Sequence, residues 1–411
     1  MTLASVATMI GAGSTVAIVS EVYNTGISYG ISFPLAIIIG SAILAIISKR
    51  IKKAADEYEA YTLVDFFEKR FDNKNKILAF FIQIFITLVA LGSQAIAMAS
   101  LASVLIGTNY TFALILAAAV TIGYTTLGGL KVDYITDFIQ FWIILIVFVL
   151  TWFFVNPKVG GLSNLIDSVP KSHLDPFAFA GPLWLVAVVF LSGLLYLGFS
   201  GTWQRIASAK SQNTARNSFI LAMPIFIILS LLFLFFGLSA KVLLGEINPD
   251  VALFSLLENA LPAPLLGVGF AAILAVLMST IDSEVIAGST IIYRQFFKKD
   301  QFENKKEIFY ARLITALFGV VGFSIAFLIP KLITLSLFSS YMSVTFALTL
   351  LFALYSDKIS SNAAFWALSL SILSLLISYP IIGPNSFIFP VVISIPILIF
   401  YDKIFKKKSL P

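Results

Sequence analysis

AAILAVLMSTIDSEVIAGSTII, residues 271–292, is long and apolar enough to cross a lipid bilayer, yet its second half carries two carboxylates and several hydroxyls. A carboxylate at membrane depth costs roughly 2.5–3.5 kcal/mol on insertion scales, and such groups usually face a cavity or a pathway. Val276, Ser279, Thr280 and Ser283 follow the i, i+3, i+4, i+7 spacing of one helix face. Hydroxyl and carbonyl oxygens, without thiols or imidazoles, suit a small hard cation such as Na⁺. The competing explanation is that these hydroxyls bond back to the carbonyl four residues earlier.

The composition places this stretch in a polytopic, all-α membrane protein. The chain has 411 residues, of which 59% are hydrophobic and 12% charged, and its mean hydropathy is +0.98. It contains no cysteine, and its one histidine, His173, lies in a polar loop. Disulfides, thiolate metal sites and Ser-His-Asp triads are therefore excluded. The net charge of +6 sits in the loops and does not indicate nucleic-acid binding.

Twelve apolar segments are predicted to span the bilayer, at residues 2–23, 29–48, 77–107, 110–127, 134–155, 179–203, 217–243, 263–293, 309–329, 331–355, 362–380 and 386–402. If the N-terminus is cytoplasmic, 23 of the 27 Lys and Arg residues fall in cytoplasmic loops and in the tail. The positive-inside rule therefore predicts a multi-pass protein of the cell (inner) membrane with both termini in the cytoplasm.

Three connections are distinctive. Residues 61–71, YTLVDFFEKRF, read as a short amphipathic surface helix with Leu63, Phe66, Phe67 and Phe71 on its apolar side. The outer segment 156–178, rich in Gly and Pro, is predicted to be irregular. The outer segment 245–262 is predicted to hold a short helix.

Two spans contain glycine breaks, Ile10–Ser14 in the first and Leu197–Thr202 in the sixth. These spans correspond in two five-span halves, the second inverted, and paired breaks of this kind point to a transporter binding site. We expect one transmembrane domain, residues 1–411, with a first repeat at 1–155, an inverted repeat at 179–355 and two additional helices within 362–402. A single glycine break would more simply indicate close helix packing.

Several motifs in the right order resemble the sodium:solute symporter family and cover most of residues 1–297. They are IGAGST (10–15), YNTGIS (23–28), YTLVDFFEKRF (61–71), YTTLGGLKVDYITDFIQ (124–140), WQRIASAKSQNTA (203–215), NPDVALFSLLENALP (248–262) and LMSTIDSEVIAGST (277–290). The resemblance implies the inverted-repeat leucine-transporter fold. Family members usually have a helix before the core, whereas this sequence starts inside the first core helix, and Met9 stands where relatives often carry a polar residue.

The resemblance also implies a Na⁺ site formed by the carbonyls of Ala7, Ile10 and Val276 and the hydroxyls of Ser279 and Thr280. At about 1.5 Å rise per residue, the first break and the late part of span eight lie in the same half of the membrane. Some members bind a second sodium ion, which would map here onto Asp137 with Ser279, Asp282 and Ser283. An acid at the start of span five would also favour the helix N-terminus without any ion.

The solute should lie between the two breaks. Candidate contacts are Ser14, Gln94, Ser200 and Trp203, with Phe199 as a lid. Alternatively, Gln94 forms an interhelical hydrogen bond, and Trp203 anchors its helix at the membrane interface. Arg205 reads as a cytoplasmic gate or loop charge. Because Lys and Arg are otherwise missing at mid-membrane, amino acids, carboxylates and sugars all remain open.

The sequence therefore predicts Na⁺-coupled symport of a small polar organic solute into the cytoplasm, with Na⁺, the solute and the lipid bilayer as partners. Proton coupling through Asp137, Asp282 or Glu284 is one alternative, and a non-transporting membrane sensor or receptor is another. An intramembrane enzyme is not expected, because these acids have no His, Cys or metal motif beside them. The sequence does not indicate an oligomeric state.

Overall fold

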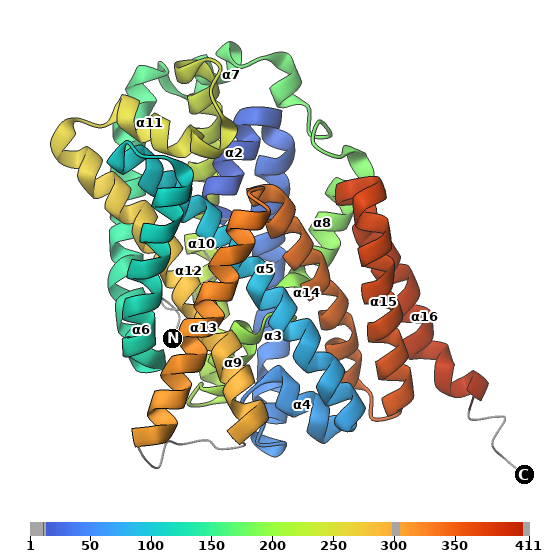
Figure 1. The fold of residues 1–411 in the computed structure, drawn as a ribbon. Helices are drawn as coiled ribbons and strands as arrows, with labels where there is room; N and C mark the ends of the chain where they lie inside the picture. The colour runs from blue at the N-terminus through green and yellow to red at the C-terminus, as the bar shows by residue number, and fades with distance from the viewer. Residues whose placement is uncertain (1–10, 12–13, 298–304, 406–411) are drawn as a thin grey trace, which may run out of the picture.

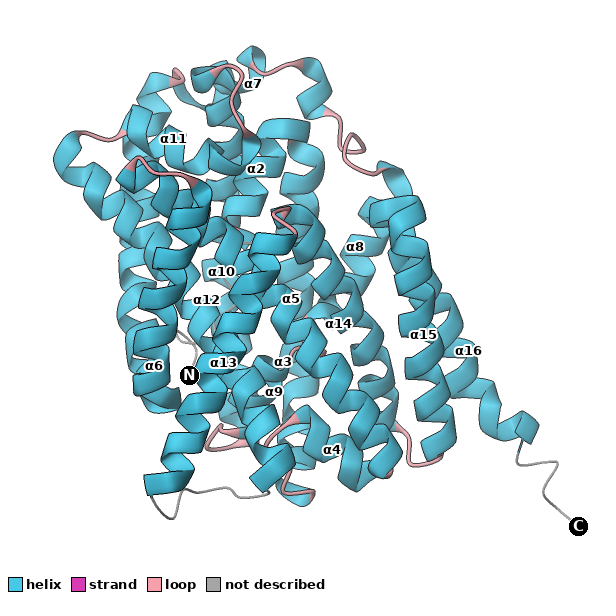
Figure 2. Cartoon of the chain, in the orientation of Figure 1, coloured by secondary structure: helices cyan, strands magenta, loops and turns pink. Residues whose placement is uncertain are grey.

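The computed structural model describes residue 11 and residues 14–297 and 305–405, and every regular element in those ranges is a helix. Long helices stand side by side, and short helices cover both ends of the bundle (Figures 1 and 2). The elements are α2 Val16–Thr25, α3 Ile27–Glu57, α4 Leu63–Arg70, α5 Asn73–Ile106, α6 Tyr110–Lys158, α7 Gly161–Ser168, η2 Lys171–Leu174, α8 Gly181–Leu195, α9 Ser200–Ala207, α10 Gln212–Leu244, η3 Pro249–Val251, α11 Ala252–Ala260, α12 Ala263–Phe297, α13 Lys305–Leu328, α14 Leu332–Tyr355, α15 Ser361–Ile382, η4 Gly383–Phe387 and α16 Ile388–Phe405.

Nine segments within the described ranges are long and apolar enough to cross a membrane. Two of them, Tyr110–Gly128 and Ile135–Lys158, belong to α6, and a third, Ser361–Ile404, contains both α15 and α16. The predicted spans 2–23 and 179–203 are missing from this set because their helices are short, ten residues in α2 and fifteen in α8. The other ten predicted spans agree with these nine segments, whereas residues 2–10, 12 and 13 of the first predicted span lie outside the described residues.

Of the first predicted break, residues 11 and 14 are described and both lie ahead of an α-helix, whereas the second break is described in full. Ahead of α2, the hydroxyls of Ser14 and Thr15 donate to the carbonyl of Gly11, at 3.2 and 2.7 Å, and the α-helix starts only at Val16. In the sixth span, α8 ends at Leu195 and α9 begins after residues 196–199. Backbone groups freed at such breaks are available to ligands and to neighbouring side chains.

The short helices follow local sequence signals. Thr62 and Asp65 form a capping box at the start of α4, with N···O distances of 3.1 and 2.9 Å, while Phe66 and Phe67 are buried, as the amphipathic pattern predicts. The predicted helix in residues 245–262 is also present, as α11. The expectation of an irregular segment at 156–178 is wrong in part, because α6 runs on to Lys158 and residues 161–168 form α7, which its fully buried Leu165 anchors.

The end of α2 is tied to the connection between α10 and η3. The Tyr23 hydroxyl donates to the carbonyl of Gly245 at 2.5 Å and accepts from the backbone N–H of Ile247 at 2.9 Å. One turn earlier, the Ser20 hydroxyl lies 3.5 Å from Oδ1 of Asp250. Burial raises the pKa of Asp250, and the Ser20 hydrogen bond offsets part of that rise. These contacts hold α2 against one end of the bundle.

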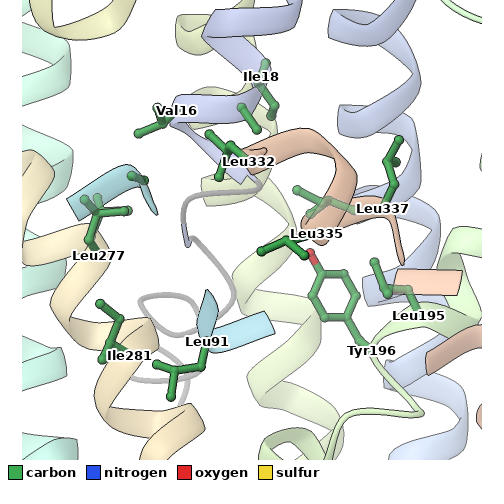
Figure 3. Close-up of a cluster of buried hydrophobic side chains, with 14 of the residues drawn as sticks. Val16, Ile18, Leu91, Leu195, Tyr196, Leu277, Ile281, Leu332, Leu335 and Leu337 are labelled. Carbon is green, nitrogen blue, oxygen red and sulfur yellow. The ribbon is translucent and has the colours of Figure 1, made fainter. Parts of the chain in front are cut away.

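Apolar side chains gather between the start of α2 and the second break. Figure 3 shows side chains from α2, α5, α12 and α14 converging there, with Leu277 and Ile281 of α12 on the same side as Leu91 of α5. Tyr196, in the second break, lies beside Leu335 of α14 in the same view. Helix α12 packs on α5 and α6 and also contacts α9, so its polar face meets the part of the bundle next to the second break.

Candidate functional site

The polar face of α12 meets two aspartates of α6. The hydroxyl of Ser279 donates to Oδ1 of Asp137, and the hydroxyl of Ser283 donates to Oδ1 of Asp133 at 3.2 Å. All four side chains are buried. The i, i+4 spacing of both pairs aligns two hydroxyls with two carboxylates along the helix contact.

Arg205 of α9 closes this cluster with a buried ion pair. Its Nη2 atom lies 2.9 Å from Oδ2 of Asp137 and 3.4 Å from Oδ2 of Asp133, and it donates to the Ser283 hydroxyl at 2.7 Å. The side chains of Arg205, Asp133 and Asp137 are 6%, 2% and 0% exposed. The expectation that Arg205 is a loop charge is wrong, because the two acids compensate its charge inside the bundle.

Asp282 points to a different neighbour. Its Oδ1 accepts hydrogen bonds from the hydroxyls of Tyr124, at 2.6 Å, and Thr125, both in the first half of α6. The residues predicted for a second cation site therefore divide in the structure. Asp137 and Ser283 contact the Arg205 cluster, and Asp282 has its own pair of donors.

The first break lies against α12 where the sequence predicts the Na⁺ site. A methyl group added to Gly11 would be 2.8 Å from Oγ1 of Thr280 and 2.8 Å from Nε2 of Gln94, so the break, α12 and α5 meet at this point. The Thr280 hydroxyl donates to the carbonyl of Val276 at 3.4 Å, as the competing back-bonding explanation expects. Ala7, Met9 and Ile10 lie outside the described residues.

A cavity of about 120 Å³ lies between the two breaks. Three predicted solute contacts line it, namely Ser14, Gln94 and Phe199. Aromatic, hydroxyl-bearing and charged side chains also line it. They are Tyr29, Ser93, Tyr196, Arg205, Phe219, Thr280, Ser283, Glu284, Ser336, Ser339 and Ser340. The cavity thus combines aromatic surface with hydroxyls, an amide and one carboxylate.

Ser200 and Trp203 lie outside this lining, because other parts of the bundle hold both side chains. The hydroxyl of Ser200 donates to Oε1 of Gln83 at 2.7 Å. The indole of Trp203 is 1% exposed, donates to the carbonyl of Ala60 at 3.0 Å and packs on Phe66 at 5.1 Å between ring centroids. Both residues fix the position of α9.

Gln83 of α5 holds the two sides of the second break together. Its Nε2 donates to the carbonyl of Gly198 at 2.8 Å, and its Oε1 accepts from Ser200. We expect Gln83→Leu to lower the thermal midpoint of the detergent-solubilised protein by several degrees, because two buried polar groups lose their partner at roughly 1–3 kcal/mol each. Gln140→Leu is the matched control, since Oε1 of Gln140 has no partner among the described residues. An equal drop in both variants would refute the role of Gln83.

Sequence reasoning missed Asp133 and Gln83. The sequence could have indicated Asp133, because it precedes Asp137 by four residues and therefore lies on the same helix face. Nothing in the sequence indicates the role of Gln83, since its partners Gly198 and Ser200 are more than a hundred residues away.

Comparisons with known proteins identify the family and the fold of the chain. The chain matches a sodium/proline symporter of Staphylococcus aureus with 28% identity over 333 residues, covering 74% of this chain and 63% of that protein, less than two thirds of its length. A solved Na⁺-coupled sialic acid symporter superposes with a TM-score of 0.81 at 17% identity, covering 97% of this chain and 87% of that one. A nucleobase-cation-symport-1 family transporter superposes with a TM-score of 0.55 at 15% identity, covering 98% and 92%.

These likenesses confirm the fold expected from the sequence, an inverted-repeat core followed by two further helices. The family model of the sodium:solute symporters matches residues 1–370, which include the whole core and the first part of α15. With its helix breaks, its polar α12 and its multi-pass bundle, the chain belongs to the sodium:solute symporter family.

Proposed function

We propose that this chain is a secondary active transporter that couples inward Na⁺ movement to uptake of a small polar organic solute. The observation that carries the proposal is the meeting of Gly11, at the first helix break, with Thr280 of α12 and Gln94 of α5 beside the central cavity. Broken helices supply backbone groups to ions and solutes, and α12 supplies hydroxyls at the same place. Membership of the sodium:solute symporter family supports Na⁺ as the coupling ion.

The proposed Na⁺ ligands are the carbonyls of Ala7, Ile10 and Val276 and the hydroxyls of Ser279 and Thr280. The closeness of Gly11 to the Thr280 hydroxyl supports this set, because it brings the first break next to the oxygen-bearing face of α12. A second site at Asp137, Asp282 and Ser283 stays a prediction. It would require the Arg205 guanidinium to move, because Nη2 now contacts both Asp137 and Ser283.

The proposed solute site is the cavity lined by Ser14, Gln94 and Phe199. We place it between a repeat at 1–155 and an inverted repeat at 179–355, with the helices within 362–402 added to this single domain. The distribution of Lys and Arg supports a cytoplasmic location for both termini, which puts α4 on the cytoplasmic side.

In this mechanism, Na⁺ bridges the first break and α12 in the outward-open state and so raises the affinity for solute. The coupling free energy is reciprocal, so bound solute must raise the affinity for Na⁺ by the same factor. Rocking of the repeats then opens both sites to the cytoplasm. Each positive charge that moves inward across 100 mV contributes about 2.3 kcal/mol to uptake.

Uptake by proteoliposomes tests the proposal. We expect a panel of labelled amino acids, sugars and carboxylates to include at least one solute whose uptake a sodium gradient drives. In Ser279→Ala/Thr280→Ala, sodium stimulation should fall by about tenfold or more, because two charge-assisted contacts to the ion are lost.

The matched control is Ser289→Ala/Thr290→Ala, the same residue pair ten positions later in α12, where the Ser289 hydroxyl bonds to Ile286 in its own helix. Unchanged sodium dependence in the first double variant would overturn the ion site. Uptake driven equally well by a proton gradient without sodium would favour the proton-coupled alternative.

A further inference from the structure

Glu284 is a charged side chain that the proposed mechanism does not use. It follows Ser283 on α12 and lines the central cavity. Within the described part of the chain its carboxylate makes no hydrogen bond and no ion pair. It is also the one acidic side chain among the described residues that line the cavity.

The neighbouring charged groups already have partners. Asp282 accepts from Tyr124 and Thr125. Arg205 lines the same cavity as Glu284, but its Nη2 is bound to Asp133 and Asp137. The direct contacts of the Arg205 guanidinium are therefore with two other acids, and Glu284 adds a further carboxyl group to the cavity wall.

An ionised carboxylate in a membrane cavity needs a positive partner, because a charge removed from water is strongly disfavoured unless an opposite charge compensates it. In a cavity that takes up solute, that partner can arrive with the solute itself. The aromatic rings of Tyr29, Tyr196 and Phe219, which also line the cavity, favour the same kind of group, since a cation is attracted to the face of an aromatic ring.

The rest of the lining suits the remainder of such a molecule. Ser93, Gln94, Ser339 and Ser340 offer neutral donors and acceptors, and Leu195 offers apolar surface. Glu284 could contact an ammonium group, the serines and Gln94 could contact a polar group such as a carboxylate, and Leu195 could contact a short carbon skeleton. A sugar or a dicarboxylate would leave Glu284 unpaired or would face it with a like charge.

Resting on the proposed function, we propose that Glu284 binds the ammonium group of the transported solute, which makes the substrate an organic ammonium compound such as an amino acid. Glu284 is more exposed than the buried Asp133, Asp137 and Asp282. In this role it selects the solute, whereas Ser279 and Thr280 bind the ion.

Binding to the purified full chain tests the assignment with matched probes. L-proline, L-alanine and L-leucine are each compared with their N-acetyl derivatives, which keep the carboxylate and carbon skeleton but lose the ammonium charge, and D-glucose is included. In NaCl, we expect at least one amino acid to bind about tenfold or more tightly than its N-acetyl derivative. This comparison in the wild-type protein needs no variant to fold.

Glu284→Gln should weaken binding of that amino acid by about tenfold or more, while Glu284→Asp, which keeps the charge, should lose less. Its dependence on Na⁺ should persist in both variants. Glu258→Gln removes an exposed carboxylate on α11 and is the charge-matched control, with affinity expected to equal that of the wild-type protein.

Two results of the binding experiment would overturn the role of Glu284. One is equal affinity of the wild-type protein for an amino acid and its N-acetyl derivative, and the other is unchanged affinity in Glu284→Gln. Sodium-driven uptake of D-glucose or of an N-acetyl derivative, but of no amino acid, would also reject the role while leaving the proposed function intact. Failure of a sodium gradient to drive uptake of any probe would count against the proposed function itself.

Discussion

Gly198→Ala is expected to reduce sodium-driven uptake to less than about a tenth of the wild-type rate, because a side chain cannot be accommodated at the second break. An added Cβ would lie 2.0 Å from the backbone oxygen of Ser343 and 2.7 Å from its carbonyl carbon. These are backbone atoms of α14, and the Ser343 hydroxyl is itself bonded to the carbonyl of Leu195 at 2.6 Å. The clash can be relieved only by moving α14 away from the break.

Such a movement would also disturb the bond between Gln83 and the Gly198 carbonyl, so we expect the thermal midpoint to fall together with uptake. Gly123→Ala in α6 is the control, because nothing lies within 4 Å of the added methyl group. Replacement of a helical glycine by alanine there should be neutral or slightly stabilising. Wild-type uptake by Gly198→Ala would show that the break is not packed as described.

Arg205→Met is expected to destabilise the protein by about 3–5 kcal/mol, since it leaves Asp133 and Asp137 buried without their cation. The measurement is the free energy of unfolding, or the thermal midpoint, of the purified protein in detergent. Arg216→Met serves as the control, because Arg216 is exposed on α10 and such surface changes are usually within about 0.5 kcal/mol.

The cause of the destabilisation can be tested by neutralising the acids. In Arg205→Met/Asp133→Asn/Asp137→Asn no charge of the cluster remains, and we expect most of the lost stability to return, because a buried ion pair as a whole contributes little net stability. A triple variant that is no more stable than Arg205→Met would mean that Arg205 acts through packing and not through its charge.

The second break shows which features of the fold can be predicted from the local sequence. Glycines at 198 and 201 both marked the second interruption, and its position was predicted within a few residues. Only the structure separates them: Gly198 abuts the α14 backbone, while nothing lies within 4 Å of a Cβ at Gly201. Glycine indicates where a chain can break, but the neighbouring helix decides which glycine is required.

Candidate site residues divide in the same way. Ser14, Gln94 and Phe199 line the cavity as expected, whereas Ser200 and Trp203 are turned toward Gln83 and Ala60. Adjacent residues on one helix point in directions about 100° apart, so the rotation of α9 within the bundle decides which of them reach the cavity. That rotation depends on packing against α3, α4 and α12, which periodicity along α9 does not encode.

By itself, the sequence determined the features that depend on near neighbours in the chain. These are the apolar spans, the two breaks, the capping box of α4 and the oxygen-bearing face at Val276, Ser279 and Thr280, because hydrophobic length, glycine and the helical repeat all act within a few residues. The tertiary structure alone decided how the charges pair. Arg205 meets Asp137 across 68 residues of sequence, and Glu284 is left facing the cavity, since buried charges are matched by helix packing and not by spacing along the chain.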